Sequence, residues 1–302
     1  MFRYLERAEN NARLTEAGFR IALPRSVETS DEWKSIITTA AAHEAYSAKH
    51  SGYDSDQVTD FLLRDKDNPG SVLSVVKAAR DNARLVRTAL TSEVWSAVNE
   101  TWMLLSDVLN EPVPVTELPE TLATIRQQSA LVRGALYGTM LRNDIYDFCR
   151  LGTYIERIDS TARILDVKYF SLLPSSASVG GRIDRVQWET ILRSVSAHRS
   201  FRWADGNEYT APHIASFLIL DRRMPRSLAF CAAQMVDNLS YLADEYMAES
   251  ESLAKARTLY ARLKERDIAS IFDEGLHEFL TSVMNDTAAL GFQIEQDYRF
   301  IK

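Results

Sequence analysis

The sequence predicts an all-α protein, a helical bundle formed from two diverged tandem repeats of about 150 residues. Apolar residues recur at helical spacing, and no stretch alternates apolar and polar residues for long enough to indicate a strand. The 11 glycines and 8 prolines lie mostly between the periodic segments, where helices are expected to end. A segment near the N-terminus also recurs in the second half of the chain, and this recurrence predicts the duplication.

The composition is typical of a globular protein. Of the 302 residues, 46% are hydrophobic and 25% are charged, which is enough apolar material for the cores of two domains. The formal net charge of −7 gives no bulk attraction to nucleic acid or to an anionic membrane. No apolar run approaches the roughly 20 residues of a membrane-spanning helix, and the charged N-terminus has no signal-peptide core. We therefore expect a cytoplasmic location and no nucleic-acid or membrane partner.

Proline and capping patterns predict where the helices begin and end. Pro24 ends a first helix, because the residue before a proline is disfavoured in the helical conformation. Thr29 and Glu32 have the spacing of a capping box and begin a helix that runs towards position 50. Asn68-Pro69 begins another, with asparagine as the N-cap and proline as the first helical residue. The helix that begins at Asn68-Pro69 is expected to end near Leu90, and another to cover 92–110. After a proline-rich loop at 112–119, mostly helix is expected to about 170, with Gly138 as a candidate break, and then a loop at 173–181. Later helices are expected to begin at Asp184, Pro212, Pro225, Ser250 and about Leu276.

One eleven-residue segment occurs twice. YLERAENNARL at 4–14 returns as YIERIDSTARI at 154–164 with five identical pairs, where unrelated segments share roughly one. The match continues through Trp33 and His43, which align with Trp188 and His198 at an offset of 155 residues (188 − 33). At an offset of 156, the matched residues are Phe61, Leu62, Asp65, Pro69, Ser71, Asp81 and Asn82 with Phe217, Leu218, Asp221, Pro225, Ser227, Asp237 and Asn238. We expect a first repeat at 1–141 and a second at 142–302, packed together as one unit.

The repeated segment gathers charged side chains on a short stretch of helix. Glu6, Asn10 and Arg13 are spaced i, i+4 and i+7, so they share one helix face, and Arg7 lies about 100° around the helix from Glu6. The second copy repeats this arrangement with Glu156, Ser160, Arg163 and Arg157.

Two interpretations of these charges are open. In the first, the arginines pair with Asp65, Asp81, Asp221 and Asp237 and fix the register of the helices. In the second, they line a polar pocket that binds a carboxylate or a phosphate, to which the guanidinium fork is suited. The recurring His43 and His198 have the same two interpretations, as histidines hydrogen-bonded at the edge of the core or as catalytic groups.

Other motifs give weaker indications. Glu274 and His277 have the Glu-x-x-His spacing of di-iron bundles, which need a second such motif and two further carboxylates, so we expect no metal site. The segment HRSFRW at 198–203 is a basic-aromatic cluster that we interpret as a helix end and not as a nucleic-acid surface. Cys149 and Cys231 fall within helical patterns and are expected to be buried thiols.

The pattern Tyr-[Leu/Ile]-Glu-Arg-x-[Glu/Asp]-x-x-Ala-Arg-[Leu/Ile] of the two segments resembles the signature of the alpha-E family, a bacterial all-helical domain named for its Glu-Arg motif. The resemblance covers nearly the whole chain, and residues 151–157 with 166–169 are similar to the family's central segment. Family members usually carry an additional stretch before the first motif, equivalent to 143–151 here. Because this chain starts almost on the motif, we expect a short first helix or a truncated start.

The resemblance implies a part in an ATP-dependent system that forms peptide or amide bonds. Genes of this family usually neighbour a circularly permuted ATP-grasp protein and often a transglutaminase-like protein, so an ATP-grasp ligase is the expected partner. The ligase would use the ATP, and no cofactor is expected on this chain itself. The motif residues that carry over as candidate catalytic groups are Glu6, Arg7, Glu156 and Arg157. The candidate substrate-binding residues are Arg13, Arg163, Tyr4, Tyr154, His43 and His198.

Three functions remain open from the sequence. The first is a component of that system which binds a carboxylate or an acyl phosphate in a Glu-Arg pocket. The second is a non-catalytic helical scaffold that recruits partners and whose motifs only hold helices together. The third is an independent amide hydrolase or transferase. The sequence therefore leaves open whether this chain is itself an enzyme.

Overall fold

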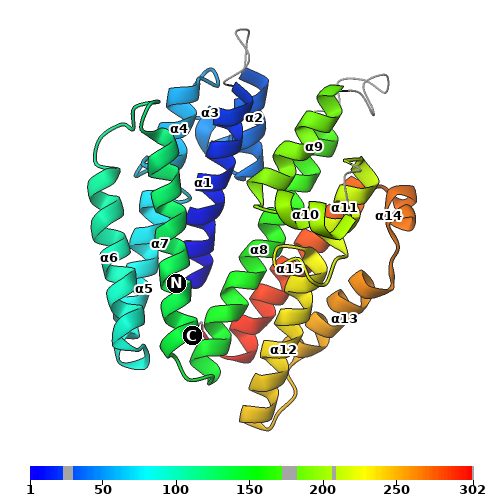
Figure 1. The fold of residues 1–302 in the computed structure, drawn as a ribbon. Helices are drawn as coiled ribbons and strands as arrows, with labels where there is room; N and C mark the ends of the chain where they lie inside the picture. The colour runs from blue at the N-terminus through cyan, green and yellow to red at the C-terminus, as the bar shows by residue number, and fades with distance from the viewer. Residues whose placement is uncertain (23–29, 172–181, 206–208, 301–302) are drawn as a thin grey trace. The chain divides into compact units, whose positions relative to one another are not determined.

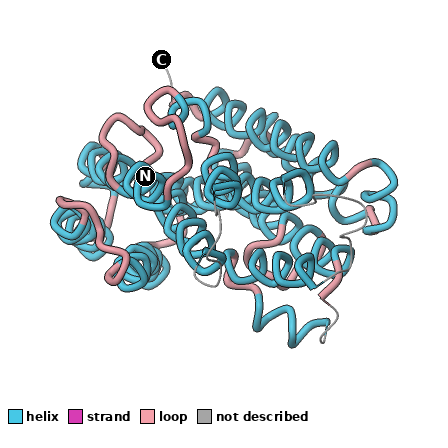
Figure 2. The backbone as a smooth tube through the Cα atoms, turned by 90° about the horizontal axis from the view of Figure 1, so that it is seen from above, coloured by secondary structure: helices cyan, strands magenta, loops and turns pink. Residues whose placement is uncertain are grey.

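The computed structural model describes residues 1–22, 30–171, 182–205 and 209–300, and these residues form helices and no strand. Figure 2 shows the helices joined by loops throughout this described part. The predicted all-α fold class is confirmed. The chain divides into two compact units, Met1–Cys149 and Arg150–Lys302, so the division falls inside one helix, α8 (Asp144–Ser171). The expected loop at 173–181 and the capping residue Thr29 lie outside the described residues.

The first unit is built around α1, which packs against both α5 and α7, while α6 packs against the other sides of α5 and α7 (Figure 1). Shorter helices α2 and α4 cover the C-terminal part of α1. The helices of this unit before α8 are α1 (Phe2–Ala22), α2 (Ser30–Thr39), α3 (His43–Ser47), α4 (Ser55–Leu63), α5 (Val72–Leu85), the 3-10 turn η1 (Arg87–Ala89), α6 (Ser92–Val108) and α7 (Leu118–Thr139).

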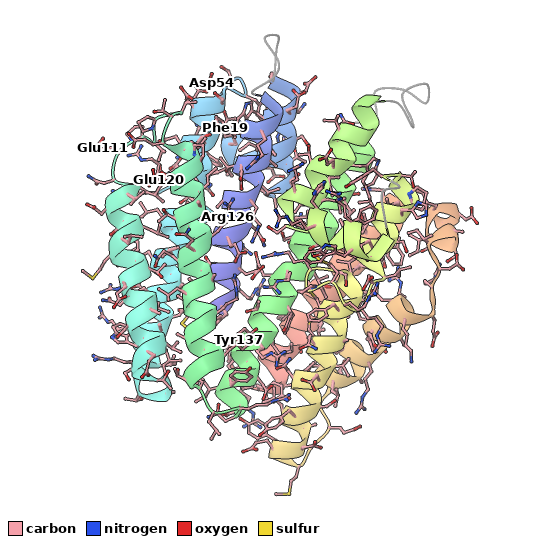
Figure 3. The ribbon with its side chains drawn as sticks, viewed as in Figure 1. Phe19, Asp54, Glu111, Glu120, Arg126 and Tyr137 are labelled. Carbon is pink, nitrogen blue, oxygen red and sulfur yellow. The ribbon has the colours of Figure 1, made fainter. Side chains whose placement is uncertain are left out.

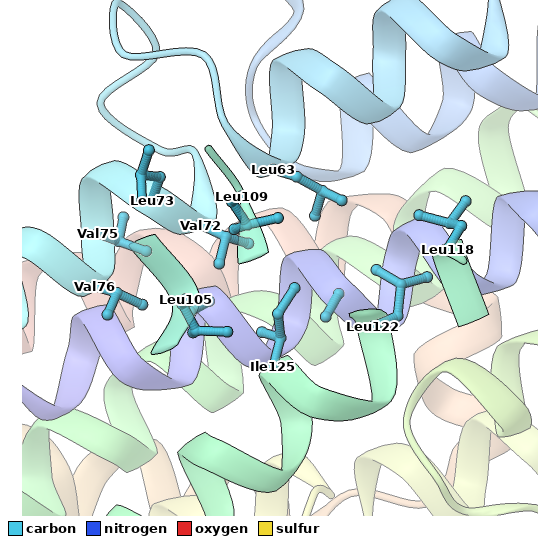
Figure 4. Packing of buried hydrophobic residues seen from close by; sticks show 12 residues of the cluster. Leu63, Val72, Leu73, Val75, Val76, Leu105, Leu109, Leu118, Leu122 and Ile125 are labelled. Atoms are coloured by element: carbon cyan, nitrogen blue, oxygen red, sulfur yellow. The ribbon is translucent and has the colours of Figure 1, made fainter. Parts of the chain in front are cut away.

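Small residues of α1 let its neighbours approach closely. Ala8 and Ala12 are fully buried in a cluster with side chains from α4, α5, α6 and α7, including Leu63, Leu105 and Leu122 (Figure 4). Burying each such leucine stabilises the fold by about 1.5–3 kcal/mol. The apolar face of the repeated segment therefore forms the centre of the first unit's core.

The α-helices of the second unit follow the same order as those of the first, with one additional short helix, α14. Its helices after α8 are α9 (Arg182–Ser194), α10 (His198–Asp205), α11 (Ala211–Ile219), α12 (Leu228–Tyr246), α13 (Glu251–Glu265), α14 (Ile268–Glu274) and α15 (Leu276–Asp297). Helix α13 packs against α12 and α15, and Gly291 of α15 lies beside Ile155 of α8. Glycine has no side chain there to hold the two helices apart.

The expected helix start at Asn68-Pro69 is wrong. Asn68 lies in the turn before α5, where its Nδ2 donates to the Phe61 carbonyl at 2.9 Å and its Oδ1 accepts from the Gly70 N–H at 2.9 Å. The helix begins at Val72 after Ser71, whose hydroxyl accepts from the Ser74 N–H at 3.2 Å. In the second unit, α12 likewise begins after the N-cap Ser227 and not at Pro225.

Two residues in the left-handed conformation end helices at positions that differ from the expected boundaries. Ala41, with φ of 54°, separates α2 from α3, where one continuous helix was expected. Ser196, also with φ of 54°, separates α9 from α10, so the segment 198–203 forms most of a helix of its own and not a helix end. Gly138 lies within the last turn of α7, which ends at Thr139, and the fifth helix ends at Leu85, before the expected Leu90.

Equivalent local bonds occur in the two units at the offsets of the sequence match. The Asp65 carboxylate accepts from the Asp67 N–H at 2.8 Å, and the Asp221 carboxylate accepts from the Arg223 N–H at 2.7 Å. Trp33 and Trp188 are both buried, with 1% and 2% of their surface exposed. Such agreement supports the predicted duplication, and superposition of the two whole units stays a prediction.

The left-handed turn at Ala41 gives a stability prediction. A β-carbon destabilises the left-handed conformation by roughly 1–2 kcal/mol, and replacement by glycine removes this strain. Glycine itself destabilises the folded state by about 0.5–1 kcal/mol, because its unfolded chain is more flexible. The net effect is that Ala41→Gly should raise the free energy of unfolding by about 0.5 kcal/mol. The control is Ala254→Gly, at an exposed position inside α13, which should lower it by about 1 kcal/mol. Urea unfolding measures both, and a loss of stability in Ala41→Gly would contradict the strained turn.

Candidate functional site

The first copy of the motif carries buried carboxylates. Glu6 and Glu9 of α1 are each 1% exposed, and a carboxylate in that setting needs a cationic or hydrogen-bonding partner. Arg133 of α7 supplies one, because its Nη1 lies 3.5 Å from Glu6 Oε2 and also contacts Glu9. Arg13 donates from Nε to the other Glu9 oxygen at 3.0 Å. This group of four side chains therefore joins α1 to α7 by charge as well as by apolar packing.

The second copy of the motif bonds to the backbone of a turn. Glu156 and Arg157 of α8 are 5% and 9% exposed, and Arg157 Nη1 donates to the Pro225 carbonyl at 3.2 Å. One helical turn later, the Thr161 hydroxyl donates to the Arg226 carbonyl at 3.0 Å. Both acceptors lie in the turn between α11 and α12. Helix α8 therefore fixes the position of this turn.

In the first unit, the motif helix donates an equivalent hydrogen bond to the turn before α5, but from a different side chain. Asn11, at the position equivalent to Thr161, donates from Nδ2 to the Gly70 carbonyl at 2.7 Å. Gly70 precedes α5 as Arg226 precedes α12, so the motif helix holds the turn before the fifth helix in both units. Buried backbone carbonyls need such donors, and their loss costs about 1–3 kcal/mol.

Tyr154 lies at the centre of a cationic cluster on α8. The guanidinium carbons of Arg150 and Arg157 lie 5.5 and 5.7 Å from the centre of its ring, within the range of a cation–π interaction. Arg150 Nη2 donates to the Tyr154 hydroxyl at 3.0 Å and also to the side-chain oxygen of Gln234 on α12. The cluster brings together two guanidiniums, a phenol and an amide.

The arginines that follow the motifs pair with carboxylates on their own helices. Arg13 Nη2 lies 2.5 Å from Glu9 Oε1, and Arg163 Nε lies 2.7 Å from Asp159 Oδ2, both at i, i+4 spacing. Both arginines thus pair with a carboxylate, as the first interpretation requires, but with one on their own helix and not with the aspartates named there. Arg7 is half-buried on α1.

Three of the expected aspartate partners are wrong. Asp65 pairs with Lys49 at 3.0 Å, Asp81 with Lys77 at 2.7 Å and Asp221 with Arg223 at 2.7 Å. Hydrogen bonds from Arg223 lower the pKa of Asp221, so this carboxyl is held in its charged form. In each case the partner is a cation close in sequence, from the same helix, the same turn or a nearby loop.

The remaining candidate residues have separate surroundings within their own units. Tyr4 is half-buried against the core of the first unit, and Tyr154 is 4% exposed. His43 is exposed, and its Nδ1 lies 3.0 Å from the Tyr53 hydroxyl. His198 Nε2 lies 3.2 Å from the Tyr209 hydroxyl. Within the described residues, neither histidine contacts the Glu-Arg motif, so the structure does not bring them into one site with it.

The described ranges contain no group of three or more His, Cys, Asp or Glu side chains that could hold a metal ion. Glu274 pairs with Arg266 at 2.5 Å, and His277 Nδ1 lies 2.6 Å from Asp166 Oδ1. The two residues of the Glu-x-x-His spacing thus have different partners.

The model of one protein family, Alpha-E, matches residues 1–299; it is described as a predicted alpha-helical domain with a conserved ER motif. The chain belongs to the Alpha-E family. Comparison with curated proteins and with solved structures gave no match. Within the described part of this Alpha-E protein, no helix combines the length and the apolar character needed to span a bilayer.

Sequence reasoning missed the arginines of α7 in this Alpha-E protein. Arg133 contacts the motif carboxylates, and Arg126, labelled in Figure 3, pairs with Glu16 of α1. The two are seven residues apart, which places them on one helix face, and that spacing was the available signal. It could not be used because nothing in the sequence shows which face of α7 packs on α1.

Removal of Arg133 tests the buried charge group. Arg133→Met should lower the free energy of unfolding by about 3 kcal/mol, because Glu6 and Glu9 lose a cation in a site closed to water. Arg20→Met is the matched control, since its pair with Glu16 is 57% exposed on the arginine side and should contribute less than about 1 kcal/mol. Equal losses in urea unfolding of the two variants would contradict a special role for the buried group.

Proposed function

We propose that this Alpha-E protein is an accessory component of an ATP-dependent system that forms peptide or amide bonds, acting beside an ATP-grasp ligase. The amide-bond system is what the family resemblance implies. The accessory role rests on one structural observation: the motif side chains bond to groups of their own unit. Arg157 donates to the Pro225 carbonyl, Arg13 pairs with Glu9, and Arg163 pairs with Asp159.

Internal partners change what the motif arginines can do. A guanidinium that already satisfies a buried carbonyl or carboxylate must exchange that partner for a ligand, and the abandoned group then loses its own bond. Leaving a buried polar group unpaired costs about 1–3 kcal/mol, which offsets much of the gain from binding the ligand. This balance favours a structural role, in which the motif side chains hold the helices together and the surface of the protein binds partners.

A second candidate function rests on the cluster around Tyr154. Two guanidiniums, Arg150 and Arg157, lie on one ring beside Gln234, and such donors suit a carboxylate or an acyl phosphate. In this version the ligase transfers the γ-phosphoryl group of ATP to a substrate carboxylate, which gives ADP and an acyl phosphate. Attack by an amine then forms the amide and releases phosphate. The cluster would hold the acyl phosphate away from water until the amine reacts.

Replacement of Arg157 separates the two functions. In the accessory version, Arg157→Ala should lower the melting temperature by several degrees, since the bond to Pro225 and the contact with Tyr154 are lost, and product per folded molecule should stay unchanged. The control is Arg163→Ala, whose pair with Asp159 is about one-third exposed and contributes little. Each variant is mixed with the neighbouring ATP-grasp protein, and product from ATP and pooled amino acids is identified by mass spectrometry.

Two results would overturn parts of this proposal. A variant with the wild-type melting temperature and no product contradicts the accessory role and supports the carboxylate-binding cluster. A wild-type mixture that consumes no ATP and forms no amide contradicts the amide-bond assignment itself. We expect this chain alone to hydrolyse no ATP, because it carries no recognisable phosphate-binding glycine loop.

A further inference from the structure

A pocket of about 270 Å³ lies in the second unit, where α10 and α11 meet the turn before α12. Trp203, Phe217 and Met224 give it apolar walls, and Asp221 and Arg223 give it polar ones. Pockets for drug-sized ligands are usually about 300–1,000 Å³, so this one fits one or two side chains of a larger ligand.

The Glu-Arg motif supports one wall of this pocket. Pro225 lines it, and the carbonyl of Pro225 accepts the hydrogen bond from Arg157. The neighbouring Arg226 carbonyl accepts from Thr161. The motif helix therefore sets the position of the pocket wall without lining the pocket itself, so Arg157 is a positioning residue for this site.

In the first unit, an ion cluster lies at the equivalent turn. There, Lys49 Nζ lies 3.0 Å from Asp65 and 2.8 Å from Asp67, both of which are carboxylates of the turn after α4. At offsets of 155 and 156 residues, three positions differ in the second unit: Ala204 stands for Lys49, Arg223 for Asp67 and Trp203 for Ala48. The second copy thus lacks the lysine that bridges the turn, reverses the charge of one turn residue and adds an indole.

Two hydrogen-bond donors of the pocket are available to a ligand. Arg223, with 77% of its side chain exposed, donates from Nε and Nη2 to Asp221 at 3.2 and 2.7 Å, which fixes the orientation of the guanidinium. Its Nη1 has no hydrogen-bond partner in the described part of the chain. Trp203 is 82% exposed, and its indole N–H is likewise without a partner among the described residues.

Exposed arginines lie on the two elements that form the pocket, α10 and the turn before α12, although the whole chain carries a formal net charge of −7. Arg199 and Arg202 of α10 and Arg222 of the turn are exposed, and the Arg222 guanidinium lies 5.6 Å from the centre of the Tyr260 ring. The equivalent residues of the first unit are Glu44, Ser47 and Lys66, whose charges cancel, so only the second unit has a net positive charge at these positions. A local excess of arginines attracts an anionic ligand.

We infer that the pocket binds an acidic peptide. The geometry provides for a glutamate or aspartate carboxylate at Nη1 of Arg223 and for a neighbouring apolar side chain against Trp203 and Met224. Arginine-to-carboxylate bonds give the selectivity for acidic residues, and the exposed indole gives the apolar contact area that a small anion would leave unused. This inference goes beyond the proposed function and does not depend on amide-bond formation.

The probe is a fluorescein-labelled Gly-Glu-Leu-Glu-Gly peptide, followed by fluorescence anisotropy, with Gly-Gln-Leu-Gln-Gly as its neutral counterpart. The wild-type protein should bind the glutamate peptide at least about tenfold more tightly than the glutamine peptide. Arg223→Asp and Trp203→Ala, which restore the residues of the first copy, should each weaken binding by about tenfold or more. Arg257→Asp changes the net charge equally at an exposed site on α13 and should leave binding unchanged.

Several results would overturn the inference. These are absence of binding by the wild-type protein, equal binding of the two peptides, or equal losses in Arg223→Asp and Arg257→Asp. If free glutamate displaces the labelled peptide at the same concentration as unlabelled peptide does, the pocket is a site for small anions, and the inference that it binds a peptide is contradicted. Both pocket variants alter exposed side chains, so their melting temperatures should match the wild type, and this is measured alongside.

Discussion

Polar side chains buried on the first helix of each unit impose the constraint on which the rest of this structure depends. Helix α1 places Glu6 and Glu9 at 1% exposure, and α8 places Arg157 at 9%. An isolated charge in such a site costs several kcal/mol, so each must meet a partner from its surroundings. The partners are Arg133 of α7 in the first unit and the Pro225 carbonyl in the second. Packing around α1 and α8 is therefore specified by polar groups as well as by apolar contact.

The two units meet this constraint differently. Buried leucines of α7 and α15 match at an offset of 158 residues (Leu118 with Leu276 and Leu122 with Leu280), and the residue equivalent to Arg133 is then Gly291. The second unit has no arginine at this place and has a glycine that lies beside α8. The side chains of the Arg163–Asp159 pair on α8 are about one-third exposed. Those of the equivalent Arg13–Glu9 pair on α1 are almost closed to water. The two units thus differ in where this charge lies, almost buried in the first unit and nearer the surface in the second.

Much of this architecture could be predicted from the sequence, because helices, their repetition and their buried tryptophans are recorded in local patterns. The partners of the charged side chains could not be predicted in this way. Asn68 and Ser71 are both good N-caps, and the choice between them depends on the bond from Asn68 to the Phe61 carbonyl, a contact between turn and helix. The spacing of the motif suggests an arginine as one partner of Asp65, whereas the fold pairs this carboxylate with Lys49. Three residues that line the pocket of the second unit differ from their equivalents in the first unit, and this difference appears only when the two units are compared.

The central claim is that the motif helix holds the turn before the fifth helix of its own unit. Amide hydrogen exchange of residues 221–227 in Thr161→Val tests it most directly, because this change removes one donor and keeps the shape of the side chain. The account predicts exchange faster by about tenfold in this turn, since a buried hydrogen bond contributes about 1–2 kcal/mol. The equivalent turn at 65–71, held by Asn11, should exchange at the wild-type rate. Unchanged exchange at 221–227, or equal acceleration of both turns, would contradict the account.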